Sequence, residues 1–248
     1  MNERKKKVDR LAFLGSLAGG LAHEIKNPLS TISVNLQLMK EDWEHSEGSR
    51  ERRTLKRIET LTKEIERLEG ILNDFLAYAR GLSLKPETGN LNRIVGDLVT
   101  FMDPEAQRHG IQVRTLLDPE LKPVPLDAKY IQLALLNILH NAFQALDEGG
   151  QTREVIIATK NQTGGVEILI TDTGPGIAAE HADKIFQVYF STKRSGTGLG
   201  LPMVKRIIEE HDGKISFQSE EGKGTSFRIF LPDRRAEFQR AKDGGGQR

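Results

Sequence analysis

The feature that most constrains the fold is a heptad repeat of apolar residues in the segment 58–79. Its members, which are separated by alternating steps of three and four residues, are Ile58, Leu61, Ile65, Leu68, Leu72, Phe75 and Ala79. This spacing places all of them on one side of an α-helix, with Glu, Arg and Lys residues between them. A helix with a single apolar stripe must pack against another element in order to bury it.

A second apolar stripe at helical spacing precedes this one, in the segment 11–41. Its members are Leu14, Ala18, Leu21, Ile25, Leu29, Ile32, Leu36 and Met39. A polar segment around residues 46–49 separates the two helices, and Gly81 with the following KPETGN ends the second helix. Two such helices cannot close a core alone, which favours a dimer in which two hairpins form a four-helix bundle. A hairpin packed onto the rest of its own chain is the alternative.

The remainder of the chain alternates between helical and strand patterns, which is typical of a sheet covered by helices on one face. Helices are predicted at 92–110, 128–146 and 200–213, and strands at 111–117, 154–160, 165–172, 214–220 and 225–232. The fold class is therefore α+β, with an N-terminal two-helix hairpin followed by an α/β two-layer sandwich. We place the domains at 1–85 and 90–232, and expect the polar segment 233–248 to be disordered.

Composition excludes several classes of function. There is no cysteine, so disulfides, thiolate zinc sites and cysteine nucleophiles are excluded. A net charge of +1 gives no general attraction to nucleic acid or anionic lipid. No apolar run reaches the length of about 18 residues that a membrane span needs, and the basic start MNERKKKVDR lacks the apolar core of a signal peptide. These features predict a cytoplasmic protein.

His23 lies in the first helix in the sequence GGLAHEIKNPLS. At about 100° per residue it points away from the apolar stripe, into solvent, so it is not a core histidine. Asn27 follows four residues later on the same face. Glu24 is close enough to accept a proton from one ring nitrogen, which would leave the other nitrogen as a nucleophile. Pro28 removes a backbone hydrogen bond and weakens the helix just past this site, or is simply tolerated there.

Asn137 and Asn141 stand one turn apart on the predicted helix 128–146, which is apolar on most of its surface. A buried amide without a partner costs about 1–3 kcal/mol, so these side chains need hydrogen bonds. A bound ligand is one source of partners, since an Asn oxygen suits Mg²⁺ carried by a nucleotide phosphate. A hydrogen bond to the helix backbone is the alternative.

Asp172 closes a predicted strand in the sequence ITDTGPGI, and Gly174, Pro175 and Gly176 then force a turn. A carboxylate held there can accept a hydrogen bond from the exocyclic amine of adenine. It would repel the carbonyl that guanine presents at the same place, which would give base specificity. An Asp that only shapes its own turn is the alternative.

The segment SGTGLGL contains Gly196, Gly198 and Gly200 and opens a helix with Pro202 in its first turn. Exposed backbone amides at a helix N-terminus attract phosphate. The segment is neither a Walker loop, because no Gly-Lys-Ser/Thr follows, nor a dinucleotide fingerprint, because its third glycine comes one residue early.

The order of these motifs resembles the catalytic core of a bacterial sensor histidine kinase. The chain carries H-E-x-x-N-P, N-x-x-x-N-A, D-x-G-x-G, the Phe-rich IFQVYFSTK, G-T-G-L-G-L and GKGTSF in that order, and the resemblance covers about residues 8–232. It implies a dimerisation and histidine-phosphotransfer hairpin, followed by an ATP-binding domain of the kind found in gyrase, chaperone and mismatch-repair ATPases.

The resemblance also implies roles for individual residues. His23 would accept the phosphoryl group, Glu24 would accept its ring proton, and Asn27 would position water in a phosphatase reaction. Asn141 would bind Mg²⁺, with Asn137 nearby on the phosphates. The adenine pocket would contain Asp172, Gly174 and Gly176, with Thr225 reaching adenine through a water. The segment from about Ala178 to Ser195 would form a lid over the triphosphate, bounded by Gly196, Gly198 and Gly200. Lys193 would contact a phosphate.

The implied partners are a second copy of the chain, ATP with Mg²⁺, a response regulator that receives the phosphoryl group on an aspartate, and an upstream sensor module. Two other functions compete with this one. An ATPase of the gyrase or chaperone type needs a water-activating carboxylate on the Asn helix, where this chain has Asn137 and no Glu. A non-catalytic dimeric scaffold is disfavoured by the intact His23, Asn141 and Asp172.

Overall fold

The structure is a computed structural model of the whole chain. It describes residues 82–148, 152–193 and 198–234, and within the N-terminal part residues 25, 28–32, 34–39, 41, 54, 56–58, 60–62, 64–65 and 68. The chain divides into two compact units, one of residues 1–81 with 191–199 and one of residues 82–190 with 200–248.

All the described residues between 25 and 41, and between 54 and 68, are helical, as the two apolar stripes predict. Side chains of both stripes are accessible to solvent in the single chain. Leu29 is 49% exposed, Leu36 53%, Ile58 46% and Ile65 49%. Apolar side chains at regular helical spacing with such exposure mark a surface that another element covers.

The second unit is built on a five-stranded sheet with the strand order β2-β4-β5-β7-β6. Its strands are β2 (Gln112–Leu116), β4 (Glu154–Gln162), β5 (Gly165–Asp172), β6 (Lys214–Glu220) and β7 (Gly224–Pro232). Strands β2 and β4 run parallel and the other neighbours are antiparallel. Two short strands, β1 (Glu87–Gly89) and β3 (Val124–Leu126), form a separate antiparallel pair.

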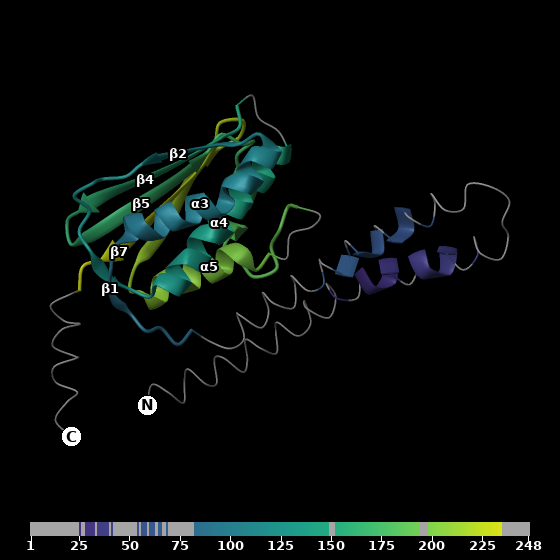
Figure 1. Cartoon of the computed structure of the whole chain (residues 1–248), viewed down its shortest axis with the longest axis horizontal. Coiled ribbons are helices and arrows are strands. Elements are labelled where there is room, and N and C mark those ends of the chain that lie inside the picture. The colour runs from purple at the N-terminus through teal and green to yellow at the C-terminus, as the bar shows by residue number, and fades with distance from the viewer. Residues whose placement is uncertain are drawn as a thin grey trace, which may run out of the picture. The chain divides into compact units, whose positions relative to one another are not determined.

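Three helices cover one face of this sheet (Figure 1): α3 (Leu91–His109), α4 (Ala128–Glu148) and α5 (Gly200–Glu210). Burial therefore alternates along the strands. In β4 the side chains of Val155, Ile157 and Thr159 are buried, and the residues between them are more exposed. The apolar stripe of α4 that faces the sheet is fully buried, from Ile131 to Leu146. The predicted α/β two-layer sandwich is therefore confirmed.

Sequence periodicity located the long elements but missed three short ones. Strands β1 and β3 have only three residues each and β3 contains Pro125, so neither has a readable alternation. A 3₁₀-helix at Ala179–Lys184 lies within the segment predicted as a lid. None of the helices in the described residues combines the length and hydropathy that a bilayer crossing requires.

Helix α4 begins at Asp127, whose carboxylate serves two backbone amides. Its Oδ1 accepts a hydrogen bond from the N–H of Tyr130 at 3.3 Å, as in an N-cap, and its Oδ2 accepts one from the N–H of Lys85 at 2.8 Å. Asp127 thus fixes the start of α4 and also attaches the segment that enters the domain before β1.

The substitution Asp127→Ala is expected to destabilise the α/β unit by about 1 kcal/mol, because the first turn of α4 loses its cap. Urea denaturation with hydrogen exchange of the α4 amides measures this loss. Asp127→Asn keeps one acceptor oxygen, which can cap α4 but cannot also accept from the Lys85 N–H, so it should lose less stability than Asp127→Ala. Equal losses in the two variants would contradict a capping role.

Candidate active site

The two asparagines predicted on α4 lie where α5 begins. An added Cβ on Gly200, the first residue of α5, would lie 3.0 Å from Oδ1 of Asn137 and 3.9 Å from Nδ2 of Asn141. The structure therefore brings these three predicted site residues together. The absence of a side chain at Gly200 keeps space between the amide groups and the N-terminus of α5, where backbone N–H groups favour an anion.

Asn137 also makes the hydrogen bond that was the alternative to a ligand role. Its Nδ2 donates to the carbonyl oxygen of Leu133 at 2.9 Å. The bond uses the donor end of the amide and directs its oxygen toward Gly200. The two interpretations are thus compatible, since one end of the side chain is held by the helix while the other faces the start of α5.

Asp172 is the last residue of β5 and is only 5% exposed. Its Oδ1 accepts hydrogen bonds from the backbone N–H of Gly174 at 2.9 Å and of Thr225 at 3.3 Å. Two amide donors on one carboxylate oxygen hold the side chain in one orientation. The side chain is thus fixed by its own turn and by the neighbouring strand β7.

The surroundings of Asp172 depend on glycines at two close backbone approaches. Gly176 has φ of 75°, and an added Cβ would collide with the carbonyl oxygen of Glu220. Gly224 has φ of 95°, and an added Cβ would collide with the carbonyl oxygen of Asp172 itself. Gly224 is a site residue that the sequence reasoning missed, although it lies in the quoted motif GKGTSF.

Ser219 on β6 fastens the turn after Asp172 to the sheet and was also missed. Its Oγ accepts from the N–H of Ile177 at 2.8 Å, donates to the carbonyl oxygen of Gly224 at 3.0 Å and lies 2.9 Å from Oγ1 of Thr225. Thr225 pairs directly with Asp172 across β5 and β7. A serine on a solvent-facing edge strand has no sequence signal that would distinguish it.

Helix α4 connects the two groups of residues. An added Cβ on Gly174 would lie 3.2 Å from Cβ of Ala145, which follows Asn137 and Asn141 at successive steps of four residues on one face of α4. This face spans about 12 Å from Asn137 to Ala145 at 1.5 Å per residue. It joins a buried carboxylate at one end to a helix N-terminus at the other, an arrangement that suits a nucleotide with its base at Asp172 and its phosphates at Gly200.

Aromatic contacts hold the middle of the predicted lid, at Phe186. The ring of Phe186 lies 6.0 Å from that of Phe217 on β6 in an edge-on arrangement, and Nζ of Lys205 on α5 lies 5.7 Å from the centroid of Phe186. Phe217 in turn lies 6.0 Å from Phe227 on β7. The Phe-rich segment is thus attached to both the sheet and α5.

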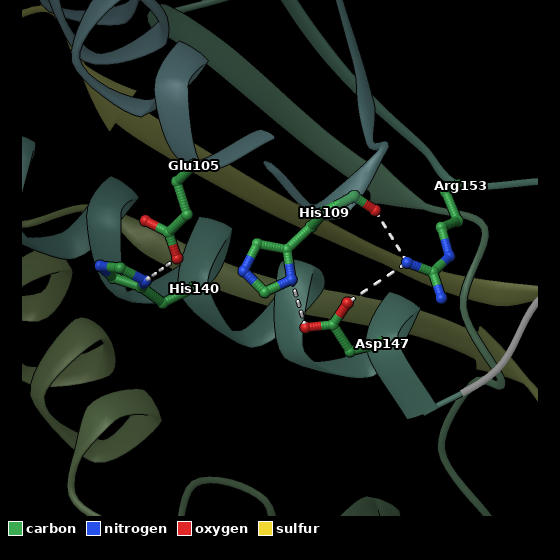
Figure 2. A network of polar contacts seen from close by, with 5 residues as sticks. All are labelled: Glu105, His109, His140, Asp147 and Arg153. Carbon is green, nitrogen blue, oxygen red and sulfur yellow. Dashed lines mark hydrogen bonds and ion pairs between the residues drawn. The ribbon is translucent and has the colours of Figure 1, made fainter. Parts of the chain in front are cut away.

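A polar network holds the C-terminal end of α4 (Figure 2). Asp147 lies 2.7 Å from Nδ1 of His109 at the end of α3, and 3.4 Å from Arg153, which also donates to the carbonyl oxygen of His109 at 2.7 Å. A second pair, Glu105 and His140, lies 3.6 Å apart on the same two helices. These contacts connect α4 to α3 and to Arg153, which precedes β4.

The other predicted site residues are not brought together in this way. Residues His23, Glu24, Asn27 and Gly196 lie outside the described residues. Gly198 is described with φ of 64°, and Lys193 closes a small turn with Ser191, whose Oγ accepts from the Lys193 N–H at 3.1 Å. Their roles stay predictions.

Comparison with known families matches both units. Residues 13–83 match the His Kinase A (phospho-acceptor) domain, and residues 126–235 match the histidine kinase-, DNA gyrase B- and HSP90-like ATPase domain. The chain belongs to the histidine kinases. The order of the two domains in this kinase is the one that its sequence motifs predict.

Individual relatives agree with this assignment. The kinase is 36% identical over 233 residues to the sensor histidine kinase ZraS of Escherichia coli, covering 94% of this chain and 48% of that protein. It is 32% identical over 243 residues to sporulation kinase E of Bacillus subtilis, covering 98% of this chain and 32% of that protein. The chain thus spans about half the length of these relatives, or less.

Among solved structures, histidine kinase ThkA in complex with the response regulator protein TrrA superposes with a TM-score of 0.78 at 29% identity. The alignment covers 95% of this kinase and 66% of that chain. The likeness therefore extends over both domain types and is not limited to the ATPase fold.

The close approach at Gly224 predicts a cost larger than backbone strain alone. Gly222 provides a matched control, since it also has positive φ, at 80°, but an added Cβ would contact nothing within 4 Å. Gly222→Ala should cost about 1–2 kcal/mol from strain. Gly224→Ala should cost more, near the upper end of the usual range of about 0.5–3 kcal/mol, because Asp172 must also move. Thermal denaturation compares the two variants, and equal costs would contradict the close approach.

Proposed function

We propose that this chain is the catalytic core of a two-component sensor histidine kinase, which uses ATP to phosphorylate its own His23 and passes the phosphoryl group to an aspartate of a separate response regulator. The observation that carries this proposal is the α4 face, which connects the buried carboxylate of Asp172 with the amides beside Gly200. The match of residues 13–83 to a phospho-acceptor domain supplies the second half of the reaction.

The nucleotide would bind along this face in one orientation. Asp172 would accept a hydrogen bond from the exocyclic amine of adenine, and its fixed orientation supports discrimination against guanine. The turn of Gly174 and Gly176, with Thr225 on the neighbouring strand, would form the walls of the base pocket. The phosphates would lie between Asn137, Asn141 and the N-terminus of α5, with Gly198, Gly196 and Lys193 on the covering segment.

Magnesium fits this site through the chemistry of its donors. Mg²⁺ binds oxygen and often keeps its waters and substrate phosphates as ligands. The described residues include no cluster of three or more His, Asp or Glu suited to a metal, so the Asn141 amide oxygen and the phosphates are the ligands that we propose. The ion would neutralise charge on the phosphates during transfer.

The transfer would take place by in-line attack. One ring nitrogen of neutral His23 would form a bond to the γ-phosphorus while the bond between that phosphorus and the β–γ bridging oxygen breaks, and ADP would leave. Glu24 would hold the proton on the other ring nitrogen, which orients the imidazole for attack. Asn27 would position a water for a separate phosphatase reaction, in which the phosphoryl group is removed from the regulator.

The partners follow from the exposed helical stripes and from the relatives. We propose a homodimer in which the stripes containing Leu29, Leu36, Ile58 and Ile65 pair in a four-helix bundle. The similarity to ThkA, which was solved with the response regulator TrrA, supports a receiver domain as the phosphoryl acceptor. An upstream sensor module would supply the signal, and the reaction would take place in the cytoplasm, where ATP is available.

Incubation with γ-labelled ATP tests the reaction. Wild type should gain an acid-labile label, and His23→Gln should gain none while binding ATP as wild type does. His140→Gln, at a half-exposed histidine of α4 beside Glu105 of α3, is the matched control and should label normally. Release of free phosphate without a protein label would instead identify an ATPase, and neither product would identify a scaffold.

The base pocket is tested by Asp172→Asn. The amide keeps an acceptor for the Gly174 N–H but removes the charge that strengthens the bond to adenine. ATP affinity should fall by about tenfold or more, which corresponds to about 1.4 kcal/mol or more, while the weak affinity for GTP changes little. Isothermal titration measures both, with the exposed Asp103→Asn as control. Unchanged ATP affinity would exclude Asp172 from the base pocket.

A further inference from the structure

His211 follows the last turn of α5 and is buried, with 8% exposure. Its Nδ1 lies 2.7 Å from the carbonyl oxygen of Ile207, and its Nε2 lies 2.9 Å from the backbone nitrogen of Asp127. The Asp127 nitrogen is a donor, so Nε2 must accept, and the hydrogen of the neutral ring is then on Nδ1. The partners of His211 thus select one neutral tautomer.

The same contacts join three segments at a single place, which we call the junction and define as Lys85, Asp127, Ile207 and His211. The Asp127 carboxylate attaches the Lys85 segment and caps α4, while its backbone N–H bonds to the ring of His211. The segment that enters the domain, the start of α4 and the end of α5 are therefore connected by hydrogen bonds.

The junction lies opposite the proposed phosphate site along two antiparallel helices. From Asp127, α4 advances ten residues to Asn137, and from His211, α5 runs back eleven residues to Gly200. At 1.5 Å per residue these lengths are about 15 and 16 Å, so the helices span nearly equal distances between their two points of contact. At one point His211 bonds to Asp127, and at the other Gly200 approaches Asn137 so closely that an added Cβ would lie 3.0 Å from its Oδ1.

We propose that His211 is a positioning residue for nucleotide binding, because its neutral ring fixes the register between α4 and α5 and so sets the space between Asn137, Asn141 and the N-terminus of α5. This inference rests on the proposed ATP-binding function. A sliding movement of α5 along α4 would change that space directly, since an added Cβ on Gly200 would lie 3.0 Å from Oδ1 of Asn137 and 3.9 Å from Nδ2 of Asn141.

The charge state of the ring makes the role testable. Burial lowers the pKa of His211, while the Ile207 carbonyl and the carboxylates of Asp127, Asp212 and Glu210 raise the pKa by less. Protonation would place a second hydrogen on Nε2, against the Asp127 N–H, and break the junction. An unfolded His211 binds its proton at about pH 6.5 while the folded one stays neutral, so its contribution to stability is complete above that pH and is lost as pH falls.

Two substitutions separate positioning from packing. His211→Leu keeps the bulk but leaves the partly buried Asp127 N–H without its acceptor. His211→Gln puts an amide oxygen near the place of Nε2, and this oxygen does not titrate. Loss of the Nδ1 donor in the Gln variant leaves the Ile207 carbonyl satisfied, because it also accepts from the backbone N–H of residue 211 at 3.2 Å.

The experiment measures the dissociation constant of Mg-ATP for the full chain, well above and well below about pH 6.5. His211→Leu should bind about tenfold more weakly at the higher pH, and His211→Gln should bind nearly as wild type does. Wild type should lose affinity at the lower pH by more than His211→Gln. Titration of ATP itself is common to all variants and cancels in this comparison, and His140→Gln should retain the wild-type dependence.

Thermal denaturation in parallel shows that each measurement is made on folded protein. A folded His211→Leu that binds Mg-ATP as wild type does would overturn the positioning role and leave the proposed kinase function intact. The positioning role would also be overturned if His211→Gln lost as much Mg-ATP affinity at the lower pH as wild type does. This comparison decides the matter if the Leu variant does not fold. Wild type that binds no Mg-ATP at all would overturn both proposals.

Discussion

The packing of α4 on the sheet and beside α5 is the constraint on which the candidate site depends. One side of this helix is buried against the strands, while the face with Asn137, Asn141 and Ala145 is directed to the start of α5 and to the turn after Asp172. A rotation of α4 about its axis would separate both groups of residues at once. The cap at Asp127 and the ion pairs at Asp147 restrain its two ends against such a change.

Much of this arrangement was predictable because it depends on periodicity. The apolar stripe of α4, the hairpin of β4 and β5, and the closing pair of β6 and β7 are long enough for the spacing of apolar residues to identify them. The role of Gly224 was not predictable, since the backbone that excludes a Cβ there is that of Asp172 on β5, which is distant in sequence. His211 gave no signal either, because its burial and its bond to Asp127 are properties of the tertiary structure alone.

The backbone, more than the side chains, shapes the surroundings of Asp172. Its carboxylate oxygen is held by two amide N–H groups, one in its own turn and one on β7. Gly176 and Gly224 allow close backbone approaches to Glu220 and to Asp172 because they have no Cβ. Backbone donors cannot rotate away from their acceptor as long side chains can. The carboxylate is thus held in the orientation that recognition of a base requires before the ligand arrives, which reduces the cost of ordering it on binding.

Asn137 extends this argument to the phosphate end. From the sequence, a hydrogen bond to the helix backbone and a bound ligand were alternative partners for this amide, and the structure shows the bond to the Leu133 carbonyl. An amide has separate donor and acceptor ends, however, and a bond at one end fixes the direction of the other. The helix backbone therefore acts as the support for an oxygen directed to the N-terminus of α5, and an anion bound there would meet groups already in place. His211 would contribute to the same preorganisation from the opposite end of the two helices, without touching the nucleotide.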